Sequence, residues 1–304
     1  MSGYMGFVGV STAQSSIMKI FPTWAGILGL PTRTLIGHDL PVDATPEQYV
    51  RLVERIRDDP DHRGALVTTH KMGLYAAASE LFDELDQFST LCGEISSISK
   101  HDGRLIGHAK DPITAGLAVG EFLPADHFGR TGAHAVCLGA GGAGTALTWN
   151  LAERADAPER IVVTDTSPER LDHLRSVHAR RGTPDGLISY LLATDPAATR
   201  GVFAAAPEGS LIVNASGLGK DRPGSPVPEG TAFPEQSYVW EFNYRGTLEF
   251  LAQARAQEAA SGLVVVDGWR YFIHGWSQVI AEVFGVELTE ELVAELSKAA
   301  LASR

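Results

Sequence analysis

The chain has 304 residues, of which 44% are hydrophobic and 20% are charged. This length exceeds the size at which one hydrophobic core usually keeps growing, so we expect two domains. The apolar share supplies enough side chains for two compact cores and excludes a disordered protein. The net charge of −12 repels phosphate backbones and anionic membrane surfaces, which argues against nucleic-acid and membrane partners.

The two cysteines carry no sign of a disulfide framework or a metal site. Cys92 and Cys137 lie far apart and lack metal-ligand spacing, so both are predicted to be buried as small apolar residues. The first residues lack a secretory signal, and no run of about 18 apolar residues occurs. We expect a cytoplasmic protein, a monomer or a homodimer, that acts on a small molecule and holds no metal.

Short apolar runs alternate with amphipathic stretches through the first third of the chain. The apolar runs are residues 7–10, 34–36 and 65–68, and the stretches between them are residues 16–29 and 46–58. The second stretch is the clearest helix, because Thr45 and Gln48 fit a capping box and Pro46 suits the first helical position. This alternation predicts parallel βα units.

A second alternation opens after the polar segment 124–131. Its predicted strands are residues 135–138, 161–163, 187–192, 210–213 and 238–242, with a helix over 142–154 and another that begins at Ser167. Helices over about 270–284 and 289–302 have no strand partner. We predict a substrate-binding domain over 1–118, a dinucleotide-binding domain over 119–245 and a C-terminal segment over 246–304.

A glycine-rich turn joins the strand 135–138 to the helix that follows it. The turn consists of Gly139, Ala140, Gly141, Gly142, Ala143 and Gly144. The first glycine permits a tight turn, the middle one lets the backbone approach a pyrophosphate, and the last lets helix and strand pack closely. The helix N-terminus would face the phosphates. The turn therefore predicts a bound nicotinamide dinucleotide, and the alternative is a merely flexible loop.

Asp165 lies 21 residues after Gly144, at the end of the next predicted strand. A carboxylate there accepts hydrogen bonds from the ribose hydroxyls and repels a 2′-phosphate, so NAD is favoured over NADP. The alternative for Asp165 is an acid near the N-terminus of the helix that begins at Ser167. Arg170 could still reach a phosphate, so NADP is disfavoured without being excluded.

Two charged residues are candidates for proton transfer. Lys71 follows the strand 65–68 at its carboxyl end, where open α/β sheets place ligand sites, and Asp111 lies near the expected crossing between domains. A lysine–aspartate pair could move the proton of an alcohol. Taken alone, each is more often a solvated surface charge.

The order of these motifs is similar to that of the shikimate dehydrogenase family, from Gly9 to the last helix. The family's Ser-rich, Asn-Val-Thr-x-Pro-x-Lys and Asn-Thr-Asp segments correspond to residues 14–17, 65–71 and 109–111. The resemblance implies a two-domain α/β fold, with an N-terminal α/β substrate domain, a Rossmann-type NAD-binding domain and C-terminal helices that return to the first domain. It also implies that Lys71 and Asp111 are catalytic and serve proton transfer at a secondary alcohol.

The resemblance extends to the cofactor and substrate contacts. The glycine turn matches the family's Gly-Ala-Gly-Gly-Ala-Gly form residue for residue. Residues 214–219 resemble the segment along the nicotinamide, which implies cofactor contacts for Asn214, Ser216 and Gly217. Residues 241–244 resemble the strand whose tyrosine reaches the substrate region, which makes Tyr244 a substrate-binding candidate or, alternatively, a core aromatic residue.

Several positions depart from the family. Ser15 matches one of the two serines that hold the shikimate carboxylate, but Ile17 replaces the other. Ala65 replaces an asparagine, Ser96 replaces another asparagine, and Gly275 replaces a glutamine. Each lost buried hydrogen bond would cost about 1 to 3 kcal/mol, so the pocket is expected to serve another substrate.

Other polar residues remain available to such a substrate. Thr69 replaces the family's proline, and Thr68 stands one residue nearer Lys71 than the family's threonine. We predict that Thr68, together with Ser15, Ser96, Tyr244 and His274, binds substrate. The further polar candidates for this pocket are His70, His108, Lys110, Arg245 and, again, His274. For each of these five, a solvated surface position is the more common alternative.

The leading hypothesis is an NAD-dependent oxidoreductase of the shikimate dehydrogenase type that acts on a polyhydroxylated cyclic or sugar-like alcohol other than shikimate. One alternative is a genuine shikimate or quinate dehydrogenase whose new residues replace the lost contacts. Another is a dinucleotide-sensing protein without chemistry, against which the Lys71 and Asp111 pair argues.

Overall fold

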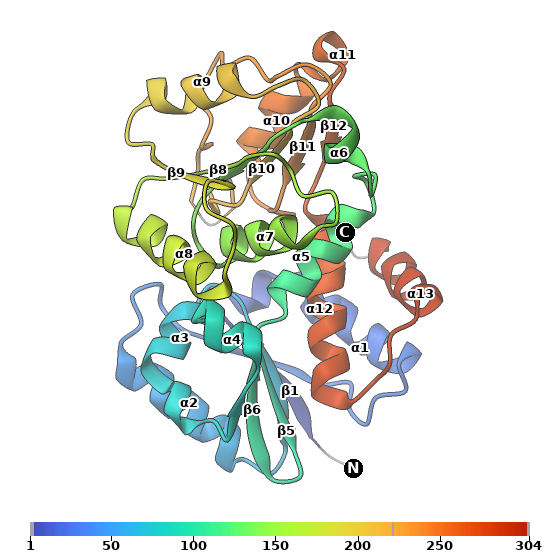
Figure 1. The fold of residues 1–304 in the computed structure, drawn as a ribbon. Helices are drawn as coiled ribbons and strands as arrows, with labels where there is room; N and C mark the ends of the chain where they lie inside the picture. Colours follow the sequence, from blue (N-terminus) through green and yellow to red (C-terminus); the bar gives the residue numbers. More distant parts are fainter. Residues whose placement is uncertain (1–2, 221, 303–304) are drawn as a thin grey trace. The chain divides into compact units, whose positions relative to one another are not determined.

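A computed structural model describes residues 3–220 and 222–302 of the chain. The chain folds into two compact units (Figure 1). Unit 1 comprises Met1–Lys110 and Ile273–Arg304, and unit 2 comprises Asp111–Phe272. By this division residues 246–272 belong to unit 2. The domain limits expected at residues 1 and 304 lie outside the described residues.

Unit 1 is built on a mixed sheet in the order β2-β1-β3-β5-β6-β4. Its strands are β1 Tyr4–Gly9, β2 Leu35–Asp39, β3 His62–Val67, β4 Glu84–Leu85, β5 Ser97–His101 and β6 Arg104–His108. β1 pairs in parallel with β2 and β3, as the alternation predicted. The strands β5 and β6 lie beyond the alternation that predicted parallel units, and β5 runs antiparallel to both β3 and β6.

The antiparallel pairing of β5 with β6 has a local cause in the turn between these two strands. Asp102 and Gly103 occupy this two-residue turn with φ of 51° and 78°. Both values lie in the left-handed region, and Asp-Gly is a strong sequence signal for such a hairpin. This signal was available in the sequence and was overlooked.

Helices cover both faces of the unit 1 sheet. They are α1 Ile17–Ile27, α2 Pro46–Asp58, α3 Lys71–Ala78, α4 Gln87–Cys92, the part of α12 Trp269–Phe284 from residue 273 onward, and α13 Glu290–Leu301, with short 3₁₀ turns Thr12–Gln14 and Ser79–Leu81. α2 carries the predicted capping box of Thr45 and Gln48. It packs with α3 on one face. The C-terminal helices pack elsewhere in unit 1, where Trp276 meets Phe7 edge to face and the Trp24 indole donates to the Leu296 carbonyl.

Unit 2 contains a fully parallel sheet in the order β12-β11-β10-β7-β8-β9. Its strands are β7 Ala135–Leu138, β8 Ile161–Asp165, β9 Ile188–Leu192, β10 Leu211–Asn214, β11 Tyr238–Glu241 and β12 Val264–Val266. The chain runs from β7 outward to β9 and then returns to β10 on the other side of β7. The carboxyl ends of β7 and β10 therefore form a topological switch point, where such sheets bind ligands.

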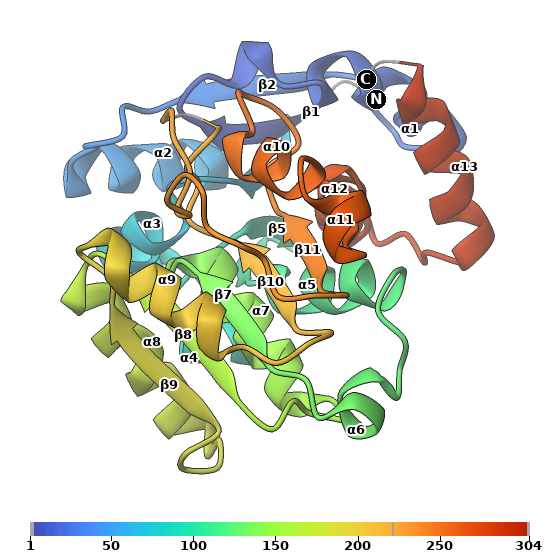
Figure 2. The same cartoon turned by 90° about the horizontal axis from the view of Figure 1, so that it is seen from above.

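Helices lie on both faces of this second sheet (Figure 2). They are α5 Asp111–Gly120, α6 His127–Thr131, α7 Gly142–Glu153, α8 Pro168–Arg181, α9 Pro196–Ala205, α10 Glu249–Arg255 and α11 Glu258–Ser261. α5, α7 and α8 share one apolar core, whereas α9 and α10 pack with alternate strand residues in another. The predicted α/β fold of two domains with returning C-terminal helices is confirmed. Cys92 and Cys137 are buried free thiols, as predicted.

Two features are absent from residues 3–220 and 222–302. No helix in these ranges combines the length and apolar character that a membrane crossing requires. No cluster of three or more metal-binding side chains occurs among the same residues.

Two buried histidines meet beside β1 in unit 1. His38 on β2 and His62 on β3 place their Nε2 atoms 3.1 Å apart. The N–H of Gly64 donates to His62 Nδ1, so the proton of His62 lies on Nε2 and is donated to His38. Burial lowers the pKa of His38 to about 4 and that of His62 to about 3. Both rings are therefore neutral at pH 7.

This pair predicts a loss of stability in acid. A histidine in the unfolded chain titrates near 6.5, so the unfolded state binds more protons than the folded state between pH 6.5 and about 4. The stabilisation is complete above pH 6.5 and is lost as the pH falls. We expect His62→Gln to reduce the slope of unfolding free energy against pH by up to about 1.4 kcal/mol per pH unit. Urea titrations measure this, with His173→Gln as control; an unchanged slope would contradict the assignment.

Candidate functional site

The glycine turn between β7 and α7 is shaped by close backbone contacts. Gly139 has φ of 119°, and a Cβ there would lie 2.7 Å from backbone atoms of Ala215 and Ser216. A Cβ on Gly144 would lie 2.0 Å from the Gly139 carbonyl oxygen. Both positions therefore require glycine, for the tight turn and the close packing that the sequence predicted.

Gly141 differs from these two glycines, because a Cβ there would meet no protein atom within 4 Å. Its backbone is extended, with φ of −79°, and precedes the first turn of α7. Amides in the first turn of a helix have no intrahelical acceptor, and the helix dipole favours an anion there. The open space above Gly141 and these amides fit the pyrophosphate of a dinucleotide.

Asp165 ends β8, the strand next to β7. Its Oδ2 accepts the N–H of Ala140 at 2.7 Å, and its Oδ1 accepts the N–H of Ser167 at 2.9 Å. The carboxylate thus anchors the glycine turn and also Ser167, the residue that caps α8, which agrees with the expected acid near the N-terminus of that helix. Its contact with a ribose stays a prediction. Each carboxylate oxygen has a second lone pair that could accept a ribose hydroxyl.

The turn after β10 contacts the glycine turn through the backbone. Asn214 is fully buried, and its Oδ1 accepts both the N–H and the hydroxyl of Ser216. Its Nδ2 donates to the Leu218 carbonyl. Gly217 has φ of 77° and open space around it. The structure thus brings the predicted residues Asn214, Ser216 and Gly217 together beside Gly139.

A buried acid supports this turn and was missed by the sequence reasoning. Glu241 ends β11, and its carboxylate accepts the Nδ2–H of Asn214 at 2.7 Å. The backbone N–H and the side chain of Asn243 donate to its other oxygen at 2.8 and 2.7 Å. Burial raises the pKa of Glu241 to about 7. The available signal was a charged residue at the end of an apolar strand.

Asp111 and Tyr244 also belong to unit 2. Asp111 begins α5, is 7% exposed, and accepts a long hydrogen bond of 3.4 Å from the Tyr271 hydroxyl. The Tyr271 ring stacks on Phe242, with ring centroids 4.4 Å apart. Tyr244 is half-buried and packs on Phe272. The hydroxyl of Tyr271 thus lies beside the carboxylate of Asp111.

Lys71 begins α3 in unit 1, just after β3 ends. Its N–H donates to the Thr68 carbonyl, and its carbonyl accepts the N–H of Ile95. Thr68 donates its hydroxyl and its N–H to the Val8 carbonyl of β1. Ser15 is buried and follows the 3₁₀ turn that comes after β1. Thr68 and Lys71 therefore stand at the carboxyl edge of the unit 1 sheet.

Ser96 and His108 in unit 1 form hydrogen bonds with other groups inside the protein. The hydroxyl of Ser96 accepts the N–H of Lys110 at 2.7 Å, which fastens the end of β6. His108 lies 2.9 Å from the Ser99 hydroxyl. The expectation that the candidate histidines are solvated is wrong, because the exposed fractions are 2% for His70, 8% for His108 and 6% for His274.

His70 shows why the solvated expectation failed. Its Nδ1 lies 2.8 Å from the Tyr49 hydroxyl, and its Nε2 lies 3.1 Å from the Leu40 carbonyl. Both ring nitrogens are thus occupied inside the protein, and burial lowers the pKa of His70. His70 holds α2 against the start of α3 and is a structural residue.

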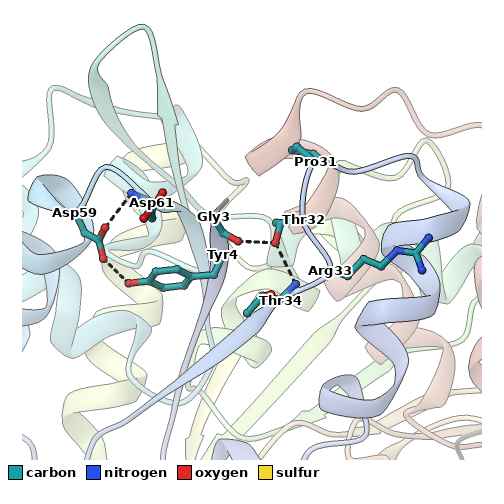
Figure 3. Close-up of a pocket in the computed structure, with 8 residues that line it drawn as sticks. All are labelled: Gly3, Tyr4, Pro31, Thr32, Arg33, Thr34, Asp59 and Asp61. Atoms are coloured by element: carbon teal, nitrogen blue, oxygen red, sulfur yellow. Dashed lines mark hydrogen bonds between the residues drawn. The ribbon is translucent and has the colours of Figure 1, made fainter. Parts of the chain in front are cut away.

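A cavity of about 530 Å³ opens in unit 1 at the opposite edge of its sheet (Figure 3). Its lining residues lie at or just before the starts of β1, β2 and β3, and the Tyr4 hydroxyl donates to Asp59 there. Ligands of open α/β sheets bind at the carboxyl ends of strands. This cavity lies at the amino ends, so it is not the candidate site.

Comparison with known proteins was made by sequence and by fold. No protein-family model matches the chain. The chain is 28% identical over 221 residues to a shikimate dehydrogenase (NADP(+)) of Streptococcus gordonii, covering 71% of this chain and 70% of the relative. It is 30% identical over 244 residues to a shikimate dehydrogenase (NADP(+)) of Xanthomonas campestris pv. campestris, covering 79% of this chain and 75% of the relative.

Solved structures show the same fold. The chain is similar to quinate dehydrogenase from Corynebacterium glutamicum in complex with NAD, with a TM-score of 0.74, 20% identity and 99% of each chain covered. It is also similar to ligand-free 5-ketofructose reductase of Gluconobacter sp. strain CHM43, with a TM-score of 0.68, 16% identity and 98% of each chain covered.

The glycine turn yields a matched pair of variants. Gly141→Ala places a methyl group in open space, so we expect unchanged thermal stability but weaker dinucleotide binding, by about tenfold or more. Gly144→Ala forces helix and turn apart, so we expect losses of both stability and binding. Calorimetric melting and fluorescence titration with NADH measure the two effects. Unchanged NADH affinity in Gly141→Ala would place the pyrophosphate elsewhere.

Proposed function

This chain belongs to the shikimate dehydrogenase family, and on that premise we propose that it is an NAD-dependent dehydrogenase of a polyhydroxylated cyclic or sugar-like alcohol other than shikimate. Membership makes it an oxidoreductase that acts on a CH–OH group with a nicotinamide cofactor. Beyond family membership, we propose the class of substrate and the choice of NAD. The proposal that the substrate is not shikimate rests on one observation. Buried apolar side chains occupy positions that bind shikimate in the family.

Two of those positions lie in the apolar interior of unit 1. Ile17 begins α1 and Ala65 lies within β3, and both are fully buried. Neither side chain has a polar atom for a carboxylate or a hydroxyl. At the third position Gly275 has no side chain at all. With each missing hydrogen bond worth about 1 to 3 kcal/mol, these three changes would weaken shikimate binding by several orders of magnitude.

The fold accommodates substrates of the proposed class. The 5-ketofructose reductase that shares it is named for a sugar-derived ketone. Such a substrate carries hydroxyl groups but no carboxylate, which agrees with the loss of one of the two serines that hold the carboxylate in the family.

The preference for NAD rests on Asp165. The carboxylate stands at the end of β8 next to the glycine turn, where it would repel the additional phosphate of NADP. The curated relatives are named for NADP(+), whereas the quinate dehydrogenase was solved with NAD, so both cofactors occur in this fold. Arg170 is exposed on the first turn of α8 and is the residue that could favour a phosphate.

We assign the proton transfer to Lys71 and Asp111. A bound nicotinamide supplies the hydride acceptor. The ammonium of Lys71 can donate a proton to the substrate oxygen or, once neutral, take one from it, and the carboxylate of Asp111 can accept a proton. The Tyr271 hydroxyl lies 3.4 Å from that carboxylate. Ser15, Thr68, Ser96, Tyr244 and His274 remain the candidates for substrate binding.

The second candidate function is shikimate or quinate oxidation. The names of the curated relatives favour it. Spectrophotometric assays of shikimate, quinate and a panel of polyols, each with NAD and NADP, separate the two candidates. Efficient shikimate turnover would overturn the substrate proposal.

The assignment of Lys71 makes a prediction about turnover. Lys71→Ala should lower kcat by about a hundredfold to ten-thousandfold, because a proton carrier is removed, and should leave NADH affinity unchanged. Lys298→Ala on α13 removes an exposed lysine of the same unit and should keep full activity. Steady-state kinetics and NADH titration measure both variants. Full activity of Lys71→Ala would contradict the assignment of Lys71 to proton transfer.

The role of Asp165 predicts the cofactor preference. Asp165→Asn removes the negative charge, so the ratio of NADP to NAD affinity should rise by about tenfold or more. The variant should also melt at a lower temperature, because an amide cannot accept both the Ala140 and the Ser167 N–H groups as a carboxylate does. Titrations with NADH and NADPH measure the ratio. An unchanged ratio would remove Asp165 as the determinant.

A further inference from the structure

Glu241 lies at the centre of a buried hydrogen-bond cluster in unit 2. The cluster consists of Glu241, Asn214, Asn243, Ser216 and the carbonyl of Leu218. The side-chain Nδ2 groups of both asparagines donate to Glu241 and also to the Leu218 carbonyl. Glu241 itself is fully buried. Its carboxylate thus connects the ends of β10 and β11 to the turn that follows β10.

The donors and acceptors of this cluster match only when Glu241 is ionised. Oε1 faces two N–H groups of Asn243, and Oε2 faces the Nδ2 of Asn214. A protonated carboxyl on Oε2 would set its O–H against the N–H of Asn214. The amide of Asn214 would have to rotate, and its Oδ1 would then release the N–H and the hydroxyl of Ser216.

The turn held by Ser216 lies directly against the cofactor turn. The backbone of Ala215 and Ser216 occupies the space where a Cβ of Gly139 would be, at 2.7 Å. The N–H of Ala215 also donates to the Leu138 carbonyl at the end of β7. A shift of residues 214–218 would therefore disturb the first glycine of the dinucleotide site.

We propose that Glu241 is a positioning residue for the cofactor, whose ionised carboxylate fixes the 214–218 turn through Asn214 and thereby makes dinucleotide binding depend on the charge of a buried acid. The proposal rests on the proposed function, because it requires that unit 2 binds a dinucleotide. Glu241 acts through Asn214 and takes no part in the chemical step.

Burial brings the ionisation of Glu241 into the physiological range, since it raises the pKa of this carboxyl to about 7. The charge of Glu249 on α10 acts in the same direction, whereas the bonds from Asn243 and Asn214 oppose it. Other charged residues close to the cluster in sequence are Lys220, Arg245 and Asp267. Cofactor affinity should therefore fall as the pH drops through about 7.

The test is a titration with NADH and NADPH from about pH 6 to about pH 8.5, which brackets this ionisation. It compares the wild-type protein, Glu241→Gln and Glu235→Gln. The glutamine at 241 keeps the shape of a protonated carboxyl and cannot ionise. Glu235 is exposed in the segment that leads into β11, so its variant removes the same charge without touching the cluster.

We expect the wild-type Kd for the preferred nucleotide to rise by up to about tenfold per pH unit below pH 7. Glu241→Gln should bind about tenfold to a hundredfold more weakly than wild type at high pH, with little pH dependence, so that the two curves converge in acid. Glu235→Gln should follow wild type. A purely structural role would lower the affinity of Glu241→Gln without removing the pH dependence.

Two results would overturn the proposal. One is an affinity of folded Glu241→Gln within about twofold of wild type at every pH. The other is a wild-type affinity that does not change through pH 7, which decides the matter even if Glu241→Gln fails to fold. Wild-type protein that binds neither nucleotide would overturn the cofactor assignment and this proposal together. Binding without oxidation of any alcohol would contradict the proposed function alone.

Discussion

The close crossing of α7 over the end of β7 is the constraint on which the rest of unit 2 depends. The helix begins so near the strand that a side chain on Gly144 would overlap the carbonyl of Gly139. This crossing sets the direction of the α7 N-terminus. The strand order then places β10 next to β7, which brings residues 214–218 beside the same amides. A dinucleotide site follows from backbone geometry more than from any one side chain.

Buried polar side chains hold loops in place in both units. Around the glycine turn, Asp165 and Asn214 accept backbone N–H groups and hold loops in place. In unit 1, His70 and Ser96 are likewise occupied by internal partners. Buried polar groups of this kind give each loop one conformation, because an unpaired donor or acceptor is costly.

Local signals in the sequence predicted what is local in the structure. The capping box of Thr45 and the strand–turn–helix around Gly139 depend on residues a few positions apart, so both were found. The hairpin at Asp102 was local too and was overlooked. The Glu241 cluster could not be predicted, because the register of β10 against β11 brings Asn214 and Glu241 together. The burial of His70 also depends on distant residues, namely Tyr49 and Leu40.

The double anchoring by Asp165 limits how this protein can evolve. The same carboxylate holds Ala140 in the glycine turn and Ser167 at the start of α8. A lineage that exchanged this acid to accept a different coenzyme would at once lose two tethers between β8 and its neighbours. If Asp165 sets the coenzyme preference as proposed, a change of preference at this position therefore also costs the two hydrogen bonds that hold the glycine turn and the start of α8.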